Sequence, residues 1–249
     1  MSESGDLEDL ERRLGEASEA DLFDLVRSHI NEINPRVARR LLRNPHVSQR
    51  VIEELLAEKR LLTAHEVRRE LAEHPRTPVA RSLDLLATLF WRDLVNMGAD
   101  PRVPPRVRRF ADQRLVQRLP GLAAGEKTVI ARKAGAGLIV RLRHDPDIRV
   151  IAALLENPRL TEGLLGPLVV SESARPEVIE LILRDRKWRH RYFLRVAAAL
   201  NFRTPVTVAL DLLPTLKKVD LGKIARDRRI AASVRRRADL LRGAARRNC

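Results

Sequence analysis

The sequence HPRTPVARSLDLLATLFWRDLVNMGADPRVPPRVRRFAD, residues 74–112, aligns without a gap with NFRTPVTVALDLLPTLKKVDLGKIARDRRIAASVRRRAD, residues 201–239. Position 74 pairs with position 201, an offset of 127, and the two stretches share 19 identities over 39 positions. Self-similarity at a fixed spacing is the signature of an internally repeated architecture. We therefore expect the chain to consist of two related halves.

The similarity continues on the N-terminal side of both stretches. Residues 51–73 align with residues 178–200 in the same register. Further upstream, NPRVARRLL (34–42) resembles NPRLTEGLL (157–165) at an offset of 123, which predicts a four-residue insertion between the two matches. The expected organisation is an acidic segment over 1–25 that is partly disordered or one helix, a first half over 26–118, a connecting helical segment over 119–145, and a second half over 146–249 with a basic C-terminal end.

Short helices are predicted along most of the chain. A polar residue followed by proline recurs before amphipathic runs. Because Asn, Asp or Thr can accept a hydrogen bond from a free N–H of the first turn, and proline fits the first helical position, each pair predicts a helix start. The pairs begin at Asn34, Asn44, Thr77, Asp100, Asp145, Asn157 and Thr204. No stretch alternates strictly between apolar and polar residues, so strands are not expected.

Helices of about 8–16 residues are marginal alone and must bury their apolar faces against neighbours. In tandem they predict an α-solenoid. The stretch HDPDIRVIAALLENPRLTEGLLGPLV (144–169) resembles bacterial HEAT-like repeats of the variant leucine-rich kind, and the resemblance covers most of residues 30–243. The expected fold is therefore all-α, a right-handed α-solenoid of short HEAT-like helix pairs built from an internal duplication with an alignment offset of about 127.

The charge is high and unevenly distributed. The 249 residues carry 48 Lys+Arg against 33 Asp+Glu, a formal net charge of +15. Residues 1–30 hold nine acids and three bases, whereas residues 217–249 hold twelve bases and three acids. Basic clusters favour anionic partners. The alternative is that a GC-rich bacterial genome places arginine on any solvated helix face.

Several classes of protein are not expected. The single cysteine, Cys249, excludes an intrachain disulfide and a cysteine metal cage. No apolar run reaches the ~20 residues of a membrane helix, and the acidic N-terminus lacks the apolar region of a signal peptide. The sequence therefore predicts a soluble, cytoplasmic protein.

No residue pattern predicts catalysis, a metal site or a cofactor. The six histidines lack metal-binding spacing, and the glycine-containing stretch 124–140 lacks the core of a phosphate loop. Four aspartates occur in both halves at positions that we interpret as helix N-caps. These are Asp93, Asp100, Asp220 and Asp227.

Two basic regions are candidates for binding an anionic partner. Residues 184–195, RDRKWRHRYFLR, interleave aromatic and basic side chains, as suits stacking on bases beside phosphate contacts. The alternative is that Trp188 and Tyr192 belong to a packed helix face, as their aligned partners Leu61 and His65 would. The other region is the C-terminal arginine cluster. The candidate binding residues are Arg186, Trp188, Arg189, Arg191, Tyr192, Arg228, Arg229, Arg235, Arg236, Arg237, Arg242, Arg246 and Arg247.

Three functions remain open at this stage. The first is a non-catalytic scaffold whose arginine-rich surface binds nucleic acid or an acidic protein. The second is a HEAT-fold DNA-repair enzyme similar to alkylpurine DNA glycosylases, for which Trp188 and Asp185 are the pair that could line a cleft; it rests on analogy of fold alone. The third is a protein–protein scaffold with no nucleic-acid role. Each takes a macromolecular partner rather than a small-molecule substrate.

Overall fold

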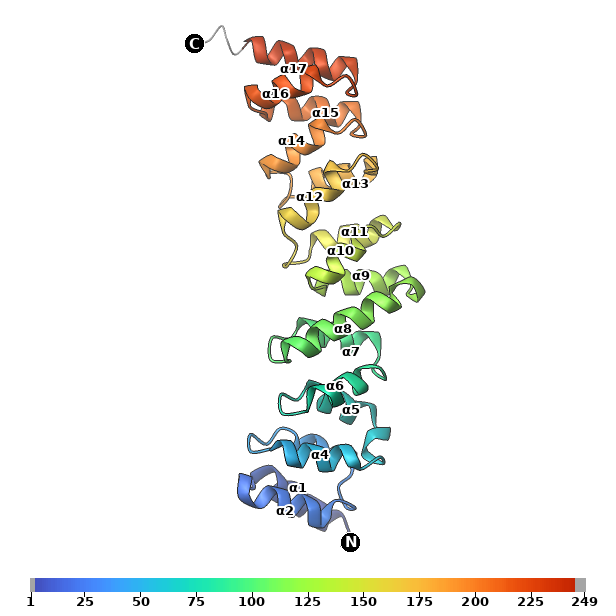
Figure 1. Ribbon diagram of the computed structural model, residues 1–249, viewed down its shortest axis with the longest axis vertical. Coiled ribbons are helices and arrows are strands. Elements are labelled where there is room, and N and C mark those ends of the chain that lie inside the picture. The colour runs from blue at the N-terminus through green and yellow to red at the C-terminus, as the bar shows by residue number, and fades with distance from the viewer. Residues whose placement is uncertain (1–2, 245–249) are drawn as a thin grey trace. The chain divides into compact units, whose positions relative to one another are not determined.

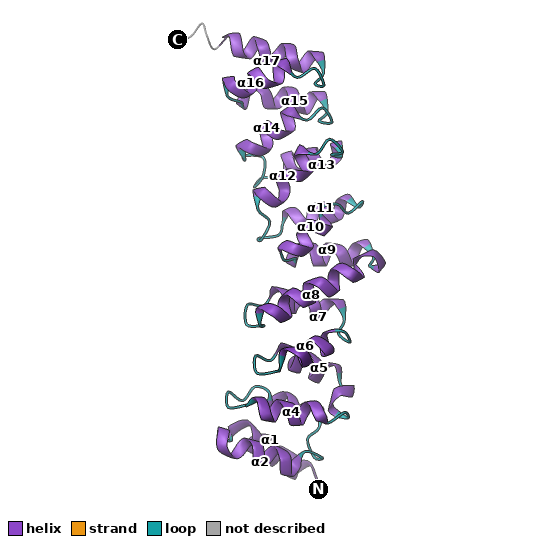
Figure 2. Ribbon diagram, viewed as in Figure 1, coloured by secondary structure: helices purple, strands orange, loops and turns teal. Residues whose placement is uncertain are grey.

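A computed structural model describes residues 3–244, and within this range the chain is helical with no strand (Figure 2). This confirms the predicted all-α class. The contacts divide the chain into two compact units, residues 1–120 and residues 121–249. No described helix has the length and the apolar character that a bilayer crossing requires.

The first unit contains eight α-helices among its described residues (Figure 1). They are α1 (Glu3–Glu16), α2 (Glu19–His29), α3 (Pro35–Leu41), α4 (Gln49–Ala57), α5 (His65–Glu73), α6 (Val79–Leu86), α7 (Trp91–Ala99) and α8 (Pro105–Arg118), with short 3₁₀ turns over Leu61–Thr63 and, at the boundary with the second unit, Leu119–Gly121. Helices α1, α3 and α5 contact one another in succession, while α2 contacts α4 and α6 contacts α8. Alternate helices thus form two layers, and the apolar faces meet between them.

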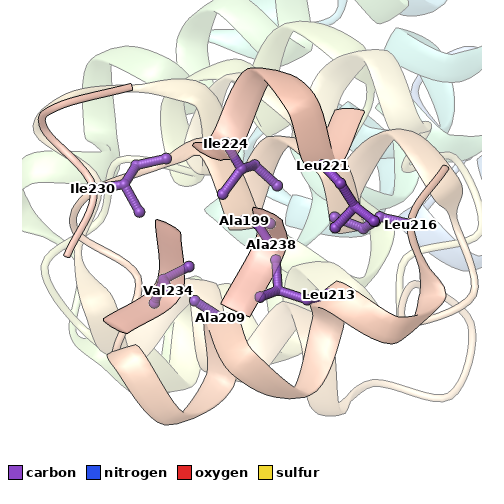
Figure 3. Packing of buried hydrophobic residues seen from close by; sticks show 9 residues of the cluster. All are labelled: Ala199, Ala209, Leu213, Leu216, Leu221, Ile224, Ile230, Val234 and Ala238. Atoms are coloured by element: carbon purple, nitrogen blue, oxygen red, sulfur yellow. The ribbon is translucent and has the colours of Figure 1, made fainter. Parts of the chain in front are cut away.

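The second unit repeats this arrangement. Its described helices are α9 (Ala124–Lys133), α10 (Ala136–Leu142), α11 (Ile148–Leu155), α12 (Glu162–Val170), α13 (Pro176–Arg184), α14 (Tyr192–Leu200), α15 (Val206–Leu212), α16 (Lys218–Arg226) and α17 (Ala232–Ala244), with a 3₁₀ turn over Leu213–Thr215. Contacts run through α9, α11 and α13 in one layer and through α10, α12, α14 and α16 in the other, while α17 contacts α15 and α16. At the C-terminal end, nine buried side chains from α14 to α17 and their turns form one apolar cluster (Figure 3).

The segments predicted to lie outside the two halves belong to the two units. The described part of the acidic N-terminal segment, 1–25, forms α1 and most of α2, and it buries Leu10, Leu14 and Leu22 in the first unit. The predicted connecting segment, 119–145, forms mainly α9 and α10, which pack against α11 in the second unit. The glycine-containing stretch 124–140 is two helices separated at Ala134 and Gly135 rather than a phosphate loop.

Each helix from α3 to α8 in the first unit has a counterpart from α12 to α17 in the second unit. In every pair the two helices begin at positions with the same offset, 127. The four-residue insertion predicted upstream is wrong. Asn34 accepts a hydrogen bond from the backbone N–H of Val37, and Thr161, at the position that the same offset pairs with Asn34, accepts the matching bond from Leu164. Asn157 instead lies in the turn before α12, so the two NPR matches are not structurally equivalent.

Most of the polar–proline pairs lie in turns and do not begin helices directly, which corrects the predicted N-caps. Only Asn34–Pro35 begins a helix as expected. After Asn157–Pro158 the next helix begins at Glu162. The hydroxyl of Thr204 donates to the carbonyl of Ala198 in the preceding helix. The polar side chain therefore mainly stabilises the end of one helix and the turn that follows it.

Buried asparagines in these turns connect neighbouring helices of one layer. The amide of Asn157 donates to the carbonyl oxygens of Ala131 and Ala134 at 2.7 and 3.0 Å, and its side-chain oxygen accepts the N–H of Arg159. Asn44 and Asn201 bond the end of the helix two before them in the same way. Short helices leave many carbonyls without an intrahelical partner, and these side chains bind some of them.

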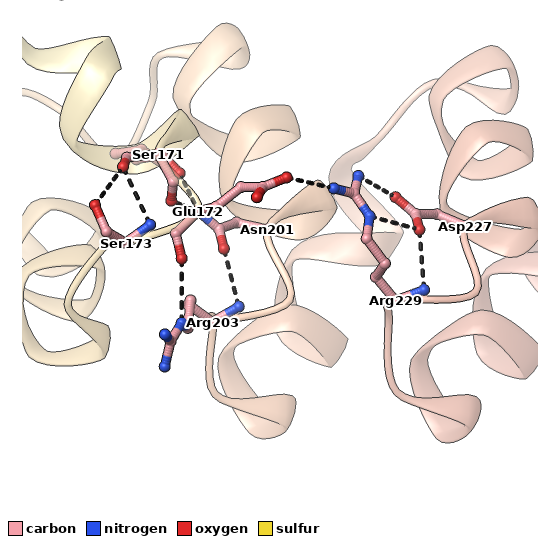
Figure 4. Close-up of polar contacts among 8 residues, drawn as sticks. Ser171, Glu172, Ser173, Asn201, Arg203, Asp227 and Arg229 are labelled. Carbon is pink, nitrogen blue, oxygen red and sulfur yellow. Dashed lines mark hydrogen bonds and ion pairs between the residues drawn. The ribbon is translucent and has the colours of Figure 1, made fainter.

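Arginines serve the same purpose and form fixed pairs with turn aspartates. In Figure 4, Arg203 donates to the carbonyl of Glu172, and Arg229 binds both Asp227 and the carboxylate of Glu172.

The pairing of a turn aspartate with the arginine two positions later recurs along the chain. The Asp100–Arg102 and Asp147–Arg149 pairs match Asp227–Arg229. The four aspartates predicted as N-caps do not occupy N-cap positions: Asp100 and Asp227 follow α7 and α16, and Asp93 and Asp220 lie within the first turns of these helices.

The turn pairs predict a measurable pKa change. The side-chain hydrogen bond from Arg149, followed by its backbone N–H, lowers the pKa of Asp147 to about 2. Arg149→Gln is expected to raise this pKa towards 3.8, as a ¹³C NMR titration of the carboxyl carbon would measure. Since the folded-state pKa is depressed, the pair stabilises the fold above pH ~4, and its contribution falls as the pH approaches 2. Arg141→Gln, an exposed change nearby, should leave the pKa unaltered; an equal shift in both variants would contradict the assignment.

Candidate anion-binding pocket

Helices α16 and α17 line a surface pocket of about 630 Å³. The buried residues Val234 and Ala238 hold one face of α17 in the core. Arg235, one position after Val234, therefore lies at the edge of the core face, and Asp239 and Arg242 follow at one-turn spacing. The pocket lining comprises Arg226, Arg235, Arg236, Arg242 and Asp239, with Ala225, Ala232 and Leu240 as its apolar part.

The pocket has more positive charge than its own carboxylate can neutralise. Asp239 is the one acid in the lining, and it accepts a hydrogen bond from Arg242 at 2.7 Å. Arg226, Arg235 and Arg236 have no ion pair with residues 8–243. The Nε of Arg235 is buried and lacks an acceptor in the described part of the chain. The same holds for the Nε of five other described arginines, so this feature belongs to the packing of the helices and does not by itself indicate a ligand.

Two of these arginines are specific to the second unit. The alignment of the two halves pairs Arg235 with Arg108, whose Nε is also buried without an acceptor among the described residues. Arg226 and Arg242, however, correspond to Ala99 and Leu115. Packing of the repeated helices accounts for the shared arginine, whereas the charge excess of the pocket arises from the arginines that the first unit lacks.

The structure brings only part of the predicted residue set together. Arg235, Arg236 and Arg242 line the pocket, while Arg237 is exposed elsewhere on α17. Arg228 and Arg229 lie in the turn between α16 and α17. Arg246 and Arg247 lie outside the described residues.

Arg186, Arg189 and Arg191 lie on the opposite edge of the second unit from Arg228 and Arg229. Turns that follow α12, α14 and α16 are linked at one edge through Glu172, Arg203 and Arg229. The turn over 185–191 follows α13 and bonds the end of α11 through Trp188. Tyr192, directly after this turn, bonds the start of α16 at the same edge. The predicted basic regions therefore do not form one continuous surface.

Trp188 is a core residue, so its predicted role in stacking on a base is wrong. Its side chain is 1% exposed, and its indole N–H donates to the carbonyl of Leu155 at 3.4 Å. The packed alternative agrees with the structure, although Trp188 lies in a turn rather than on a helix. Leu61, its aligned partner in the first unit, is also fully buried.

Tyr192 has a structural role at the start of α14. Its hydroxyl donates to Asp220 at 2.7 Å and accepts the N–H of Lys217 at 2.9 Å. Burial is the largest cause of its raised pKa. In the first unit the matching residues are His65 and Asp93, joined at 2.9 Å. This contact, present in both units, joins the starts of two helices of the same layer, α5 to α7 and α14 to α16. The Tyr192 hydroxyl therefore already has two partners within the chain.

The pair nominated for a glycosylase does not form an exposed base-binding site. Asp185 accepts the backbone N–H groups of Lys187 and Trp188, and the Trp188 ring is buried. The described residues contain no group of three or more His, Cys, Asp or Glu side chains arranged to hold a metal ion.

Sequence reasoning missed a basic stripe in the first unit. Arg36, Arg39, Arg40 and Arg43 line a cavity of about 660 Å³ with residues of α1 and α5. Arg36, Arg39 and Arg40 lie on one face of α3 at spacings of three and four positions, and Arg43 follows in the turn after the helix; the spacing was visible in the sequence. Glu11, 7% exposed, binds Arg36 and Arg40 at 3.3 Å each.

Comparison of the chain with protein families, curated proteins and solved structures gave no match.

Proposed function

We propose that this chain is a non-catalytic binding protein that docks an acidic segment of a protein partner in the α16–α17 pocket. The observation that carries the proposal is the uncompensated charge: four arginines face one aspartate. Guanidinium groups bind carboxylates through paired, charge-assisted hydrogen bonds. Leu240, 66% exposed beside these arginines, would contact an apolar side chain next to the acid.

A protein partner fits these residues better than nucleic acid does. Binding to single strands combines phosphate contacts with aromatic stacking. Trp188 is buried, and the hydroxyl of Tyr192 is bound to Asp220. The predicted phosphate-binding arginines lie on two edges of the second unit, and Arg229 is bound to two carboxylates. A compact pocket with an apolar rim suits a carboxylate-bearing peptide.

We further infer that each unit is a right-handed α-solenoid of short HEAT-like helix pairs and that the units arose by duplication. Three observations support this. Six helices of each unit begin at the same offset, 127. The His65–Asp93 and Tyr192–Asp220 contacts occupy matching positions. The hydroxyls of Thr77 and Thr204 donate to matching carbonyls.

The binding proposal predicts a site-specific loss of affinity. The probe is a fluorescein-labelled peptide of sequence EELEELEE, and fluorescence anisotropy measures its affinity for the full chain. Changing Arg235 and Arg236 together to Gln is expected to weaken binding about tenfold or more, since each charge-assisted hydrogen bond contributes roughly 1.5–3 kcal/mol. Changing Arg228 and Arg237 to Gln removes the same charge outside the pocket and should cost less than about threefold.

Equal losses in the two double variants would refute the pocket and indicate general charge attraction. Single- and double-stranded oligonucleotides are measured in parallel across a salt titration. If they bind more tightly than the peptide, with a steep decrease in log K against log salt, the partner is nucleic acid and the proposal of an acidic protein segment fails.

A further inference from the structure

The first unit carries two cavities that meet at one arginine. The cavity of about 660 Å³ is lined by α1, α3 and α5, and a second cavity of about 540 Å³ is lined by α5 and the turn after α7. Arg43 lines both. We call the two adjacent cavities together the Arg43 groove. It lies within the first unit and is separate from the α16–α17 pocket.

Charge in the Arg43 groove is balanced overall. The two cavities together are lined by six arginines and six carboxylates. In the α16–α17 pocket, by contrast, four arginines face one carboxylate. A polyanion entering the Arg43 groove would meet as many repelling as attracting groups. A ligand that carries both signs of charge avoids this conflict, because it can place each charge against its opposite.

Internal ion pairs leave one arginine and three acids of this groove without an ion pair among residues 8–243. Glu73 is the half-buried acid of these three, since Glu16 and Glu66 are exposed. Arg36 and Arg40 bind Glu11, Arg39 and Arg69 bind Glu70, and Arg102 binds Asp100. Arg43 is exposed and forms no ion pair with residues 8–243. Glu73, half-buried in the same cavity, also lacks an ion pair within these residues.

Glu73 is in an unfavourable environment as a charged group. Burial is the largest cause of its raised pKa; Arg69 opposes the shift, and the nearby carboxylates of Asp100, Asp93 and Glu70 add to it. A carboxylate withdrawn from water without an ion-pair partner costs free energy, and a cation from a ligand would recover part of that cost.

We propose that the Arg43 groove binds a peptide segment of a partner protein that carries both charges, with Arg43 binding its carboxylate and Glu73 its lysine or arginine. The two groups line one cavity, so a single short segment reaches both. Because the two groups belong to different segments of the chain, a peptide bound in a given direction must present its acid and its base in one order. The Arg43 groove is thus selective for the order of acidic and basic residues in the peptide. The α16–α17 pocket is selective for negative charge.

Selection from a phage-displayed library of random twelve-residue peptides tests the proposal with the full chain as target. Peptides enriched on the wild-type protein are expected to carry one acidic and one basic residue in a preferred order and spacing. The charge-exchanged variant Arg43→Glu/Glu73→Arg should enrich the opposite order. For one enriched peptide, Arg43→Gln and Glu73→Gln should each weaken binding about tenfold, and the exposed change Arg81→Gln should weaken it less than twofold.

Three outcomes would overturn the proposal. Enrichment of purely acidic peptides, or tighter binding of an oligonucleotide that depends on Arg43, would indicate a polyanion site. The same preferences in wild type and the charge-exchanged variant would place binding elsewhere. Unchanged affinity in both glutamine variants would exclude the two residues. Far-UV circular dichroism verifies that each variant is folded, and the two glutamine variants keep the test valid if the exchanged variant does not fold. None of these results depends on Arg235 or Arg236.

Discussion

Asn157→Ala is expected to lower the free energy of unfolding by about 3 kcal/mol, because it removes three hydrogen bonds from a fully buried site. The Asn157 side chain is 0% exposed and joins two carbonyls near the end of α9 to the turn before α12. Alanine would leave these carbonyls without their donor and also open a small cavity. Urea denaturation followed by far-UV circular dichroism measures the effect.

Two further variants separate the causes of this loss. Asn157→Asp keeps the shape but replaces the amide donor by a carboxylate facing two carbonyls, so its cost should equal or exceed that of alanine. Asn31→Ala, at an exposed position, should cost less than about 0.5 kcal/mol. A loss below about 1 kcal/mol for Asn157→Ala would show that the bonds between neighbouring helices contribute little to stability.

Trp188→Ala is expected to destabilise the second unit by about 4 kcal/mol, in the range for deletion of a large aromatic side chain from a core. The ring is 1% exposed, and its N–H bonds the end of α11, so the substitution would open a cavity beneath the turn over 185–191. Trp188→Phe keeps much of the volume and should cost less than half as much. Chemical denaturation of the two variants against wild type measures the difference.

Binding measurements on the Trp188 variants distinguish a side chain that only packs in the core from one that contacts the partner. Under conditions in which both variants remain folded, affinity for the acidic peptide should match that of wild type within about twofold. If Trp188→Ala retained full stability and lost binding of peptide or nucleic acid, the ring would be part of the binding surface and the structural assignment would be wrong.

Much of the secondary structure was predictable because its causes are local. The alignment of the two halves implied matching helices, and α4 and α13 indeed begin at the paired positions Gln49 and Pro176. The helix starts at proline were less predictable. An asparagine before proline can accept an N–H of a following helix, as Asn34 does, or donate to carbonyls of an earlier helix, as Asn157 does. Asn34 and Asn157 begin similar sequences, NPRVARRLL and NPRLTEGLL. Which hydrogen bonds each side chain forms depends on the helices packed next to it.

The candidate site was predictable only in part. Arginine excess near the C-terminus indicated the region of Arg235 and Arg236, which line the pocket. The basic residues around Trp188 favour a binding surface, whereas its apolar counterpart Leu61 favours a packed position, and the structure agrees with the second interpretation. The Arg43 groove was missed because its two cavities combine side chains from helices that are far apart in the sequence.

The sequence by itself determined the all-α class and the short helices, since apolar periodicity and turn residues are local features. The alignment of residues 51–112 with 178–239 also indicated the offset of 127 for those helices, whereas the structure extended it to α3 and α12. Only the tertiary structure decided which arginines are available to a partner. Arg229 meets Glu172 across 57 residues, and Arg203 meets the carbonyl of the same residue across 31. Stacking of the helices brings Arg203 and Arg229 to acceptors that lie far away in the sequence. Only the folded structure therefore shows that Arg235 and Arg43 form no ion pair with residues 8–243.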